Sequence, residues 1–503
     1  MNLNYFKYLI KSQKIAILFF FVLYLGISYT PFLDGGSAKT STNLLEVIFT
    51  IATVLSAMAS FALPVLLFSF VHRKRSVDVY FSLPVSRKEL LITTILFAFL
   101  LCFGFFFITS LIAYLLRGLT AILFVDYLLV LCANAFIFLA LLLINSFLYL
   151  IANNIFDGIV ILAAYYFLPI MLLIMTSTYL GQMVAGSPYG EYPNYLSQYT
   201  SPLYLAAMVS YRTISYCIHH LHTTVTDLNW MHVLFLGIYA ALAAFGLYRH
   251  FVLRKTERAE QLSNNFFAYP FIINAYAFIV LMILGFTIIS EKNGWGGFLI
   301  FYLILFFIYF VATFVYRRKI QIELKSLLLF LVGVCITLAF SFLSWKTRGF
   351  QMAYNYTLDK DKYLTYDYSA YVTASNLSIP YNYYNETPVD EAANVYFSIT
   401  IPTDELEKHK DIIDLLEKHR HEAIDLFYTK SMYQGGAHFY VYNSNSPTFP
   451  LITSNQYTYH SSTPLTEADL KKIDEYYPVT VWNERYEDVI PLEKFLEERG
   501  AKG

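Results

Sequence analysis

Long apolar stretches dominate the first 345 residues of the chain. A membrane core about 30 Å thick is crossed by about 20 apolar residues in a helix. On this criterion the sequence predicts nine membrane-spanning segments, at 15–33, 44–71, 90–116, 122–150, 155–180, 229–250, 270–290, 297–316 and 326–345. Only Ala152, Asn153, Asn154 and Asp157 interrupt the fourth and fifth segments, so the number of spans between 122 and 180 stays open.

The pattern changes at about Lys346, where Tyr, Asn and Asp become frequent. The runs VYFSITI and HFYVY are typical of strands, and a helix is predicted between them, capped by Thr403 with acidic residues in its first turn. Its apolar stripe contains Leu406, Ile412, Ile413, Leu415, Leu416 and Ile424. A second helix is predicted from Thr466 to Tyr476. We therefore expect a small α+β domain over 346–503.

Two further segments flank the predicted spans. The start, MNLNYFKYLIKSQK, is basic and amphipathic, and the apolar run after it lacks a small-residue cleavage site. We interpret it as the approach to an uncleaved first span. Residues 181–228 form a long loop whose Gly, Pro, Tyr and Ser content suggests a partly re-entrant or amphipathic structure.

Composition supports a membrane protein and makes a soluble enzyme an unfavourable interpretation. Hydrophobic residues make up 57% of the 503 residues and charged residues only 14%, whereas soluble domains are about 25% charged. Residues 1–345 hold 20 Lys and Arg against 12 Asp and Glu, and residues 346–503 hold 15 against 24. A basic membrane part therefore precedes an acidic domain.

The distribution of Lys and Arg predicts the orientation, because these residues concentrate in cytoplasmic loops. With a cytoplasmic N-terminus, sixteen of the twenty Lys and Arg in 1–345 fall on the cytoplasmic side. The four on the other side are Lys39, Arg117, Arg212 and Lys292. Nine spans would then place 346–503 outside the cell in a multi-pass membrane protein, and one span more or fewer would reverse that placement.

The motifs of several enzyme and carrier classes are missing from the sequence. GGSAKTST at 35–42 lacks the Gly that a phosphate-binding loop needs before Lys39, so ATP would have to be bound by another subunit. HRHEAID at 419–425 has Asp425 where a metalloprotease needs its second His. Glu46, Asp126 and Asp157 fall near span ends, which argues against proton- or sodium-coupled transport.

Several polar and sulfur-containing residues have two interpretations each. His219, His220 and His222 near Cys217 are either a metal site or incidental histidines, and we favour the second. All four cysteines, 102, 132, 217 and 335, are expected in the core. Asn134 and Asn145 are expected to form hydrogen bonds between helices rather than a ligand site. We predict no cofactor, no metal site and no nucleic-acid partner.

The segment HRKRSVDVYFSLPVSRKELL, residues 72–91, separates the second and third predicted spans. Two basic clusters flank an amphipathic stretch that contains Val77, Val79, Tyr80, Phe81 and Leu83 and ends at Pro84. The basic clusters by themselves are explained as anchors of orientation. The apolar face between them must lie on the membrane or dock onto a protein. Ser86 and Glu89 match a capping box at the start of the next helix.

This segment resembles the coupling-helix loop of permease subunits in ABC transporters of the ABC-two class. Members share a basic start, a short amphipathic stretch and a sequence similar to Ser82-Leu83-Pro84-Val85-Ser86-Arg87 before the third span. The start NYFKYLIKSQK is similar to the interfacial connecting helix of the class. Departures are Ser76-Val77 in place of Gly-Thr, and Thr93-Thr94 where many members have Lys.

The resemblance implies a six-span permease core over 1–252, three additional spans over 253–345, and the acidic domain of extended Gram-positive permeases. It also implies two cytoplasmic ATPase subunits, a second identical or related permease, and a surrounding bilayer as partners. The expected ATPase-docking residues are Arg73, Lys74, Arg75, Val77, Phe81, Leu83, Pro84, Arg87 and Lys88. The expected cargo is an amphipathic compound such as an antimicrobial peptide or a lipid.

Two alternatives belong to other functional classes. The chain could be a membrane-anchored sensor or interaction protein for cell-envelope stress that uses its Tyr-rich domain for binding. It could also be a polytopic transferase, for which Asp126, Asp157 and Asp227 are too isolated to form a paired-carboxylate site.

Overall fold

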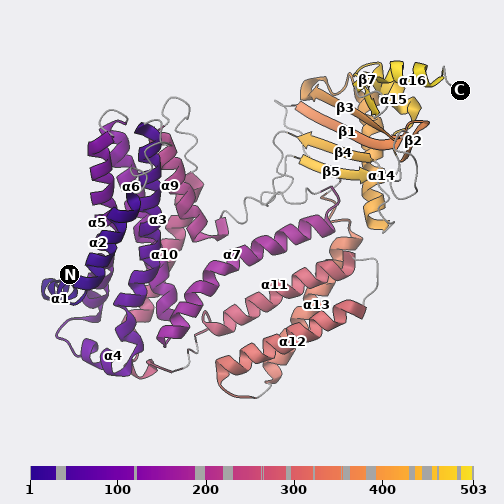
Figure 1. Ribbon diagram of the computed structural model, residues 1–503. Coiled ribbons are helices and arrows are strands. Elements are labelled where there is room, and N and C mark those ends of the chain that lie inside the picture. Colours follow the sequence, from indigo (N-terminus) through magenta and orange to yellow (C-terminus); the bar gives the residue numbers. More distant parts are fainter. Residues whose placement is uncertain are drawn as a thin grey trace. The chain divides into compact units, whose positions relative to one another are not determined.

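The computed structural model of the chain contains a helical part and an antiparallel sheet (Figure 1). It describes residues 2–29, 41–117, 122–186, 199–218, 230–261, 263, 265–290, 296–320, 323–352, 354, 363–380, 392–429, 437–443, 456–461, 464–483 and 489–500. The chain divides into two compact units. Unit 1 comprises 1–170, 197–276 and 311–321, and unit 2 comprises 171–196, 277–310 and 322–503.

The described residues include eight helices that are long and apolar enough to cross a membrane, so the chain is a polytopic helical membrane protein. They lie in α3 (Ser41–Leu67), α5 (Arg87–Arg117), α6 (Phe124–Ile151), α7 (Ile155–Met183), α10 (Trp230–Val252), α11 (Tyr269–Ser290), α12 (Gly296–Arg317) and α13 (Leu324–Lys346). These correspond to the second to ninth predicted segments. The predicted first segment, 15–33, is not among the eight. It corresponds to α2 (Lys14–Ser28), which is bent by 69° against α1 (Leu3–Ser12), and it makes a ninth span only if this bent pair is counted as one.

The interruption at 152–154 separates α6 from α7, which resolves the open question between 122 and 180 into two helices. Part of the loop 181–228 is also helical, as α9 (Pro202–Ile218). One face of α9 is buried in unit 1, including Leu205, Val209 and Cys217. The remainder of that loop at 187–198 and 219–229 lies outside the described residues, and with it the three histidines and Asp227.

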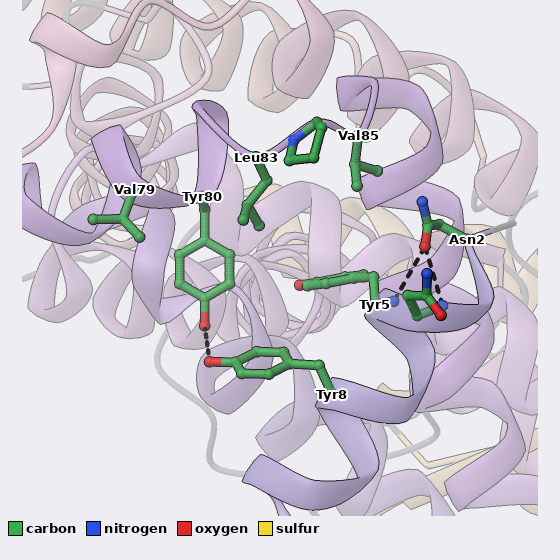
Figure 2. Close-up of a pocket in the computed structure, with 9 residues that line it drawn as sticks. Asn2, Tyr5, Tyr8, Val79, Tyr80, Leu83 and Val85 are labelled. Carbon is green, nitrogen blue, oxygen red and sulfur yellow. Dashed lines mark hydrogen bonds between the residues drawn. The ribbon is translucent and has the colours of Figure 1, made fainter.

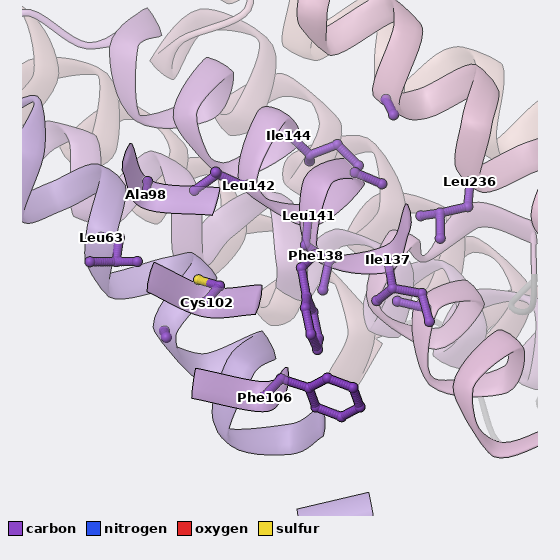
Figure 3. Packing of buried hydrophobic residues seen from close by; sticks show 14 of the residues in the cluster. Leu63, Ala98, Cys102, Phe106, Ile137, Phe138, Leu141, Leu142, Ile144 and Leu236 are labelled. Atoms are coloured by element: carbon purple, nitrogen blue, oxygen red, sulfur yellow. The ribbon is translucent and has the colours of Figure 1, made fainter. Parts of the chain in front are cut away.

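The core of unit 1 is packed around α6, whose apolar residues are buried on several sides because α3, α5, α9 and α10 surround it. Phe138 and Leu141 of α6 are fully buried, and the Phe138 ring meets Phe106 of α5 at 5.3 Å (Figure 3). Cys102 and Cys217 are buried as predicted, but Cys132 and Cys335 are exposed, so those two do not belong to a core. Both of these lie on helices whose outer surface must be apolar in a bilayer, and a thiol meets that requirement.

Polar side chains inside unit 1 bond to one another between helices. Thr53 Oγ1 of α3 donates to Asn134 Oδ1 of α6 at 3.0 Å. Asn145 Nδ2 donates to Ser60 O at 3.0 Å and lies 3.1 Å from Ser60 Oγ, while Tyr166 Oη donates to Asn145 Oδ1 at 2.6 Å. The prediction that both asparagines form interhelical hydrogen bonds is confirmed.

Unit 2 contains a seven-stranded antiparallel sheet with the order β5-β4-β1-β3-β6-β7, and β2 pairs with β1. The strands are β1 (Tyr363–Thr373), β2 (Asn376–Pro380), β3 (Ala392–Pro402), β4 (Ala437–Asn443), β5 (Gln456–Ser461), β6 (Thr480–Asn483) and β7 (Val489–Pro491). The helices α14 (Lys410–Thr429), α15 (Glu467–Asp474) and α16 (Leu492–Gly500) complete the predicted α+β domain.

Alternation along the strands explains the core of this domain, because successive side chains in a strand point to opposite faces. Tyr366 and Tyr368 of β1 are buried, and so are Phe397 and Ile399 of β3. Tyr368 and Phe397 are paired in the register and their rings stack at 5.0 Å. Leu416 of α14 belongs to the same buried cluster, so the helix packs against this face of the sheet.

The two predicted helices of this domain have different outcomes. Thr466 caps α15 in a capping box with Asp469, so the predicted second helix is confirmed. The predicted first helix begins later than expected, because Thr403–Glu405 form a 3₁₀ turn and α14 starts at Lys410. No side-chain hydrogen bond caps the 3₁₀ turn, and the buried stripe starts only at Ile412.

We expect Asn145→Ala to lower the stability of the protein by about 2 kcal/mol, because it removes the interhelical hydrogen bonds to Ser60 and Tyr166. The measurement is thermal unfolding in a mild detergent. Leu139→Ala is the control, since Leu139 lies on the same helix but is 40% exposed. An equal or larger shift for Leu139→Ala would contradict the structural role of the asparagine.

Candidate functional site

The loop between α3 and α5 is an ordered structure. A 3₁₀ turn at Ser69–His72 leads into the short helix α4 (Lys74–Phe81), and a tight turn at 82–86 leads into α5. Ser86 N–H donates to Glu89 Oε2 at 3.1 Å, and Glu89 N–H donates to Ser86 Oγ at 3.3 Å. This reciprocal pair confirms the predicted capping box and fixes where α5 begins.

The inner face of α4 holds it against unit 1. Val77 is 1% exposed, so an apolar side chain suits this position. Tyr80 stacks on Phe70 with 4.1 Å between ring centroids, and Phe81 meets Phe251 of α10 at 5.9 Å. Val77 and Phe81, expected to dock a partner, therefore make contacts within the chain.

Arg87 joins the end of the loop to the end of α10. Its Nη1 donates to Val252 O at 3.2 Å and to Arg254 O at 2.8 Å, and its guanidinium lies 4.4 Å from the centre of the Phe81 ring. A cation near helix C-terminal carbonyls is favourable because these groups lack helical partners. Lys88 Nζ lies 5.6 Å from the centre of the Tyr248 ring of the same helix.

The outer face of the loop leaves a mixed basic and apolar surface. The exposed residues among those predicted to dock are Arg73, Lys74, Arg75, Leu83, Pro84 and Lys88. Val79 is 61% exposed and lies one helical turn after Arg75, while Leu83 is 36% exposed. Val79, Leu83 and Pro84 are therefore the exposed apolar residues of the 72–91 segment.

The N-terminal helix α1 packs beside this surface. The Asn2 side chain accepts hydrogen bonds from the backbone N–H groups of Asn4 and Tyr5, which caps the helix. Tyr8 and Tyr80 share a hydrogen bond of 3.2 Å between their hydroxyls, and the Tyr5 ring meets Tyr80 edge-on at 6.5 Å. Helix α1 is thus bound directly to α4.

The start of α5 holds α1 from the other side. Asn2 N–H donates to Thr93 Oγ1 at 3.2 Å, and the Tyr5 hydroxyl lies 3.5 Å from Thr94 Oγ1. Both threonines are fully buried. Thr93 and Thr94, one of the two departures from the ABC-two pattern, therefore contact the N-terminal helix.

A pocket of about 510 Å³ lies between α1 and the loop (Figure 2). Its wall contains Tyr5, Tyr8 and Tyr80 together with the exposed residues Val79 and Leu83, and it also includes Asn2, Asn4, Pro84 and Val85. The volume falls within the range of about 300 to 1,000 Å³ that is typical of binding sites. None of the described residues that line it is charged, so it suits an apolar or aromatic group with a polar tip.

The segment after α10 supports the loop from behind. Arg254 is 7% exposed, and its Nη1 donates to Leu150 O at 2.9 Å and Ala152 O at 3.1 Å at the C-terminus of α6. Glu260 accepts the Lys74 N–H at 3.3 Å with Oε1 and donates its own N–H to Asn153 O at 2.9 Å. The residues 253–260 thereby connect α6, α10 and α4.

His72 is enclosed where these elements meet. It is 1% exposed, and its ring lies edge-on to Tyr149 with 4.5 Å between centroids. Burial, together with the positive charge of Arg254, lowers the pKa of His72 to about 3. The same burial, together with Arg258, lowers the pKa of Arg254 to about 10. The imidazole is therefore neutral at physiological pH.

The participation of α1 in this site was not predicted. Val79 was placed in the amphipathic stretch but not among the expected docking residues. The i, i+3 spacing of Tyr5 and Tyr8 was the available signal, but a helix with such spacing also suits a membrane surface. GGSAKTST lies largely outside the described residues, as do the three histidines. Within the part of the chain that the structure describes, no group of three or more His, Cys, Asp and Glu side chains is placed to hold a metal ion.

Comparison with protein-family models, with curated protein sequences and with solved structures found no match for this chain.

The buried His72 leads to a prediction about pH. Because the folded-state pKa of about 3 lies below the ordinary value of 6.5, its contribution is full above pH 6.5 and is lost as the pH falls toward 3. The loss is about 1.4 kcal/mol for each pH unit in this window. Thermal unfolding in detergent at pH 7 and pH 5 should therefore show a smaller acid-induced decrease for His72→Gln than for the unaltered protein. Equal decreases would show that His72 takes up its proton in the folded state.

Proposed function

We propose that the chain is the membrane-spanning permease subunit of an ATP-driven ABC transporter, with ATP bound and hydrolysed by separate cytoplasmic subunits. The observation that carries the proposal is the loop 72–91, in which a short helix is fixed on its inner face and presents basic and apolar residues on its outer face. Its resemblance to the coupling-helix loop of ABC-two permeases supports the same assignment.

The docking surface in this proposal has two parts. Arg73, Lys74 and Arg75 face acidic residues of the ATPase or lipid phosphates. Val79, Leu83 and Pro84 provide apolar contacts, and an apolar or aromatic side chain of the ATPase enters the pocket beside Tyr8 and Tyr80. Val77, Phe81 and Arg87 position this surface through contacts within the chain.

Movement of the docked ATPase would be transmitted through the contacts of α4. Tyr80 connects α4 to α1 through Tyr8, and Arg87 connects the start of α5 to the end of α10. A displacement of α4 would therefore act on α1, α5 and α10 together. These contacts suit a short lever at the cytoplasmic end of the bundle.

We further propose that the protein exports or clears an amphipathic compound, such as an antimicrobial peptide or a lipid. The hydrogen-bonded side chains inside unit 1 that involve Asn134 and Asn145 are uncharged amides and hydroxyls. Asp126 is a buried carboxylate of α6, but it lies in the first turn of that helix. A neutral network beyond the helix end is better suited to such a cargo than to a carrier whose ion binds at a carboxylate there.

The first test is a double substitution on the outer face of the loop. Val79→Asp together with Leu83→Asp should weaken ATPase association at least tenfold, because two exposed apolar contacts become charged. Co-purification of the ATPase in mild detergent and ATP hydrolysis in the isolated complex are the measurements. Undiminished association would remove the loop as the docking surface.

Ile320→Asp is the matched control, because Ile320 is 93% exposed and belongs to a different loop predicted on the same side. It should leave the ATPase bound. Purification of the intact chain without any ATPase, in several detergents, would favour the sensor alternative and direct attention to the domain over 346–503.

A second test concerns orientation. With the N-terminus inside and nine spans, alkaline phosphatase fused after the C-terminal domain should be active, because this enzyme forms its disulfides only outside the reducing cytoplasm. The same enzyme fused after Arg318, in a predicted cytoplasmic loop, should be inactive. The opposite pattern would place the acidic domain and the loop 72–91 on the sides opposite to those proposed.

A further inference from the structure

Four successive residues after α13 have left-handed backbone conformations. The φ angles are 56° for Arg348, 66° for Gly349, 54° for Phe350 and 61° for Gln351. Gln351 N–H donates to Arg348 O at 3.2 Å, so the segment closes a left-handed turn. Glycine adopts this conformation readily, but other residues bring Cβ too close to the following carbonyl oxygen. Three of the four residues are therefore strained.

Gly349 also lies in close contact with the end of α7. A Cβ atom at this position would lie 2.9 Å from Met183 O and 3.1 Å from the Tyr428 hydroxyl. The close approach requires glycine at this position, and the positive φ favours it. The left-handed turn therefore packs against the end of α7 and is also continuous in sequence with α13.

The last turn of α14 holds the turn in place. The Tyr428 hydroxyl donates to Met183 O at 2.7 Å and accepts the Ala185 N–H at 3.3 Å. Its ring meets Trp345, in the last turn of α13, edge-on at 5.1 Å. Tyr428 therefore connects three helix ends that are far apart in the sequence.

A second set of contacts closes the outer side of the turn. The Arg348 guanidinium bonds to Asp425 of α14 and to the Tyr354 hydroxyl, and the Tyr354 hydroxyl donates to Asp425 Oδ1 at 2.7 Å. The side chains of Arg348 and Asp425 are 45% and 52% exposed, so this ion pair contributes little. Apolar packing adds to these contacts, because Leu180, Val184 and Ala185 at the end of α7 belong to the buried cluster of the sheet domain. The two hydroxyl bonds of Tyr428 are the polar contacts that close the turn.

We propose that residues 346–352 and 354 form a strained latch, closed by Tyr428, whose release separates α14 and its sheet from the ends of α7 and α13. Strain in the turn opposes the Tyr428 bonds, which brings the closed and released states near in free energy. A ligand or partner of the C-terminal domain that prefers one state would then change how α7 and α13 end. The latch is a conformational device, and it does not depend on the proposed transport function.

The sharpest test removes strain without removing a contact. Gln351 is exposed, and Gln351→Gly should slow amide hydrogen exchange in 346–354 and at Ala185 by up to about tenfold, with the full-length protein in nanodiscs. Lys418→Gly, at an exposed right-handed position of α14, is the matched control and should accelerate exchange in that helix. Unchanged or faster exchange in Gln351→Gly would overturn the latch, because the turn would then hold no strain.

The opposite test opens the latch. Tyr428→Phe keeps the ring but removes both hydroxyl bonds, so exchange at Ala185 and in 346–354 should rise about tenfold while β1 and β3 keep their protection. Unaltered exchange at Ala185 would show that Tyr428 does not close the latch. If β1 and β3 also lose protection, the substitution has unfolded the domain. The direction of the change in exchange caused by Gln351→Gly then decides whether the turn is a strained latch.

Discussion

The structure depends on one constraint, which is that polar groups placed in an apolar surrounding must find their partners within the chain. The backbone meets it by forming helices wherever the sequence is continuously apolar. The side chains meet it by bonding across helices, as Asn134 does with Thr53 and Asn145 with Ser60 and Tyr166. The same requirement applies at the ends of the helices. Arg254 donates hydrogen bonds to two carbonyls at the end of α6, and Arg87 donates to two carbonyls at the end of α10.

The loop 72–91 is an extension of the helical bundle of unit 1. Its inner residues satisfy helix ends and fill the space between α1, α5 and α10, which leaves only its outer residues for another molecule. Residues that hold the loop in place therefore alternate along the sequence with residues that it exposes to a partner. Val77, Phe81 and Arg87 hold the segment, whereas Arg75, Val79 and Leu83 are presented by it.

Features governed by local sequence could be predicted, and features governed by distant contacts could not. The apolar segments of the eight long helices, the capping box at Ser86 and the helix that begins after Thr466 depend on neighbouring residues, and all of them were predicted. The pairing of Tyr8 with Tyr80 joins residues 72 positions apart. The left-handed turn at 348–351 likewise depends on Met183 and Tyr428, since three of its residues have no intrinsic preference for that conformation.

The neutral network inside unit 1 has a consequence for energetics across the membrane. An elementary charge that moves through a potential of 100 mV changes the free energy by about 2.3 kcal/mol. Asn134, Asn145 and their partners Thr53, Ser60 and Tyr166 form this network without a formal charge. A rearrangement of these helices relative to one another would carry no gating charge on these side chains. The membrane voltage would therefore neither drive nor resist that step through this network.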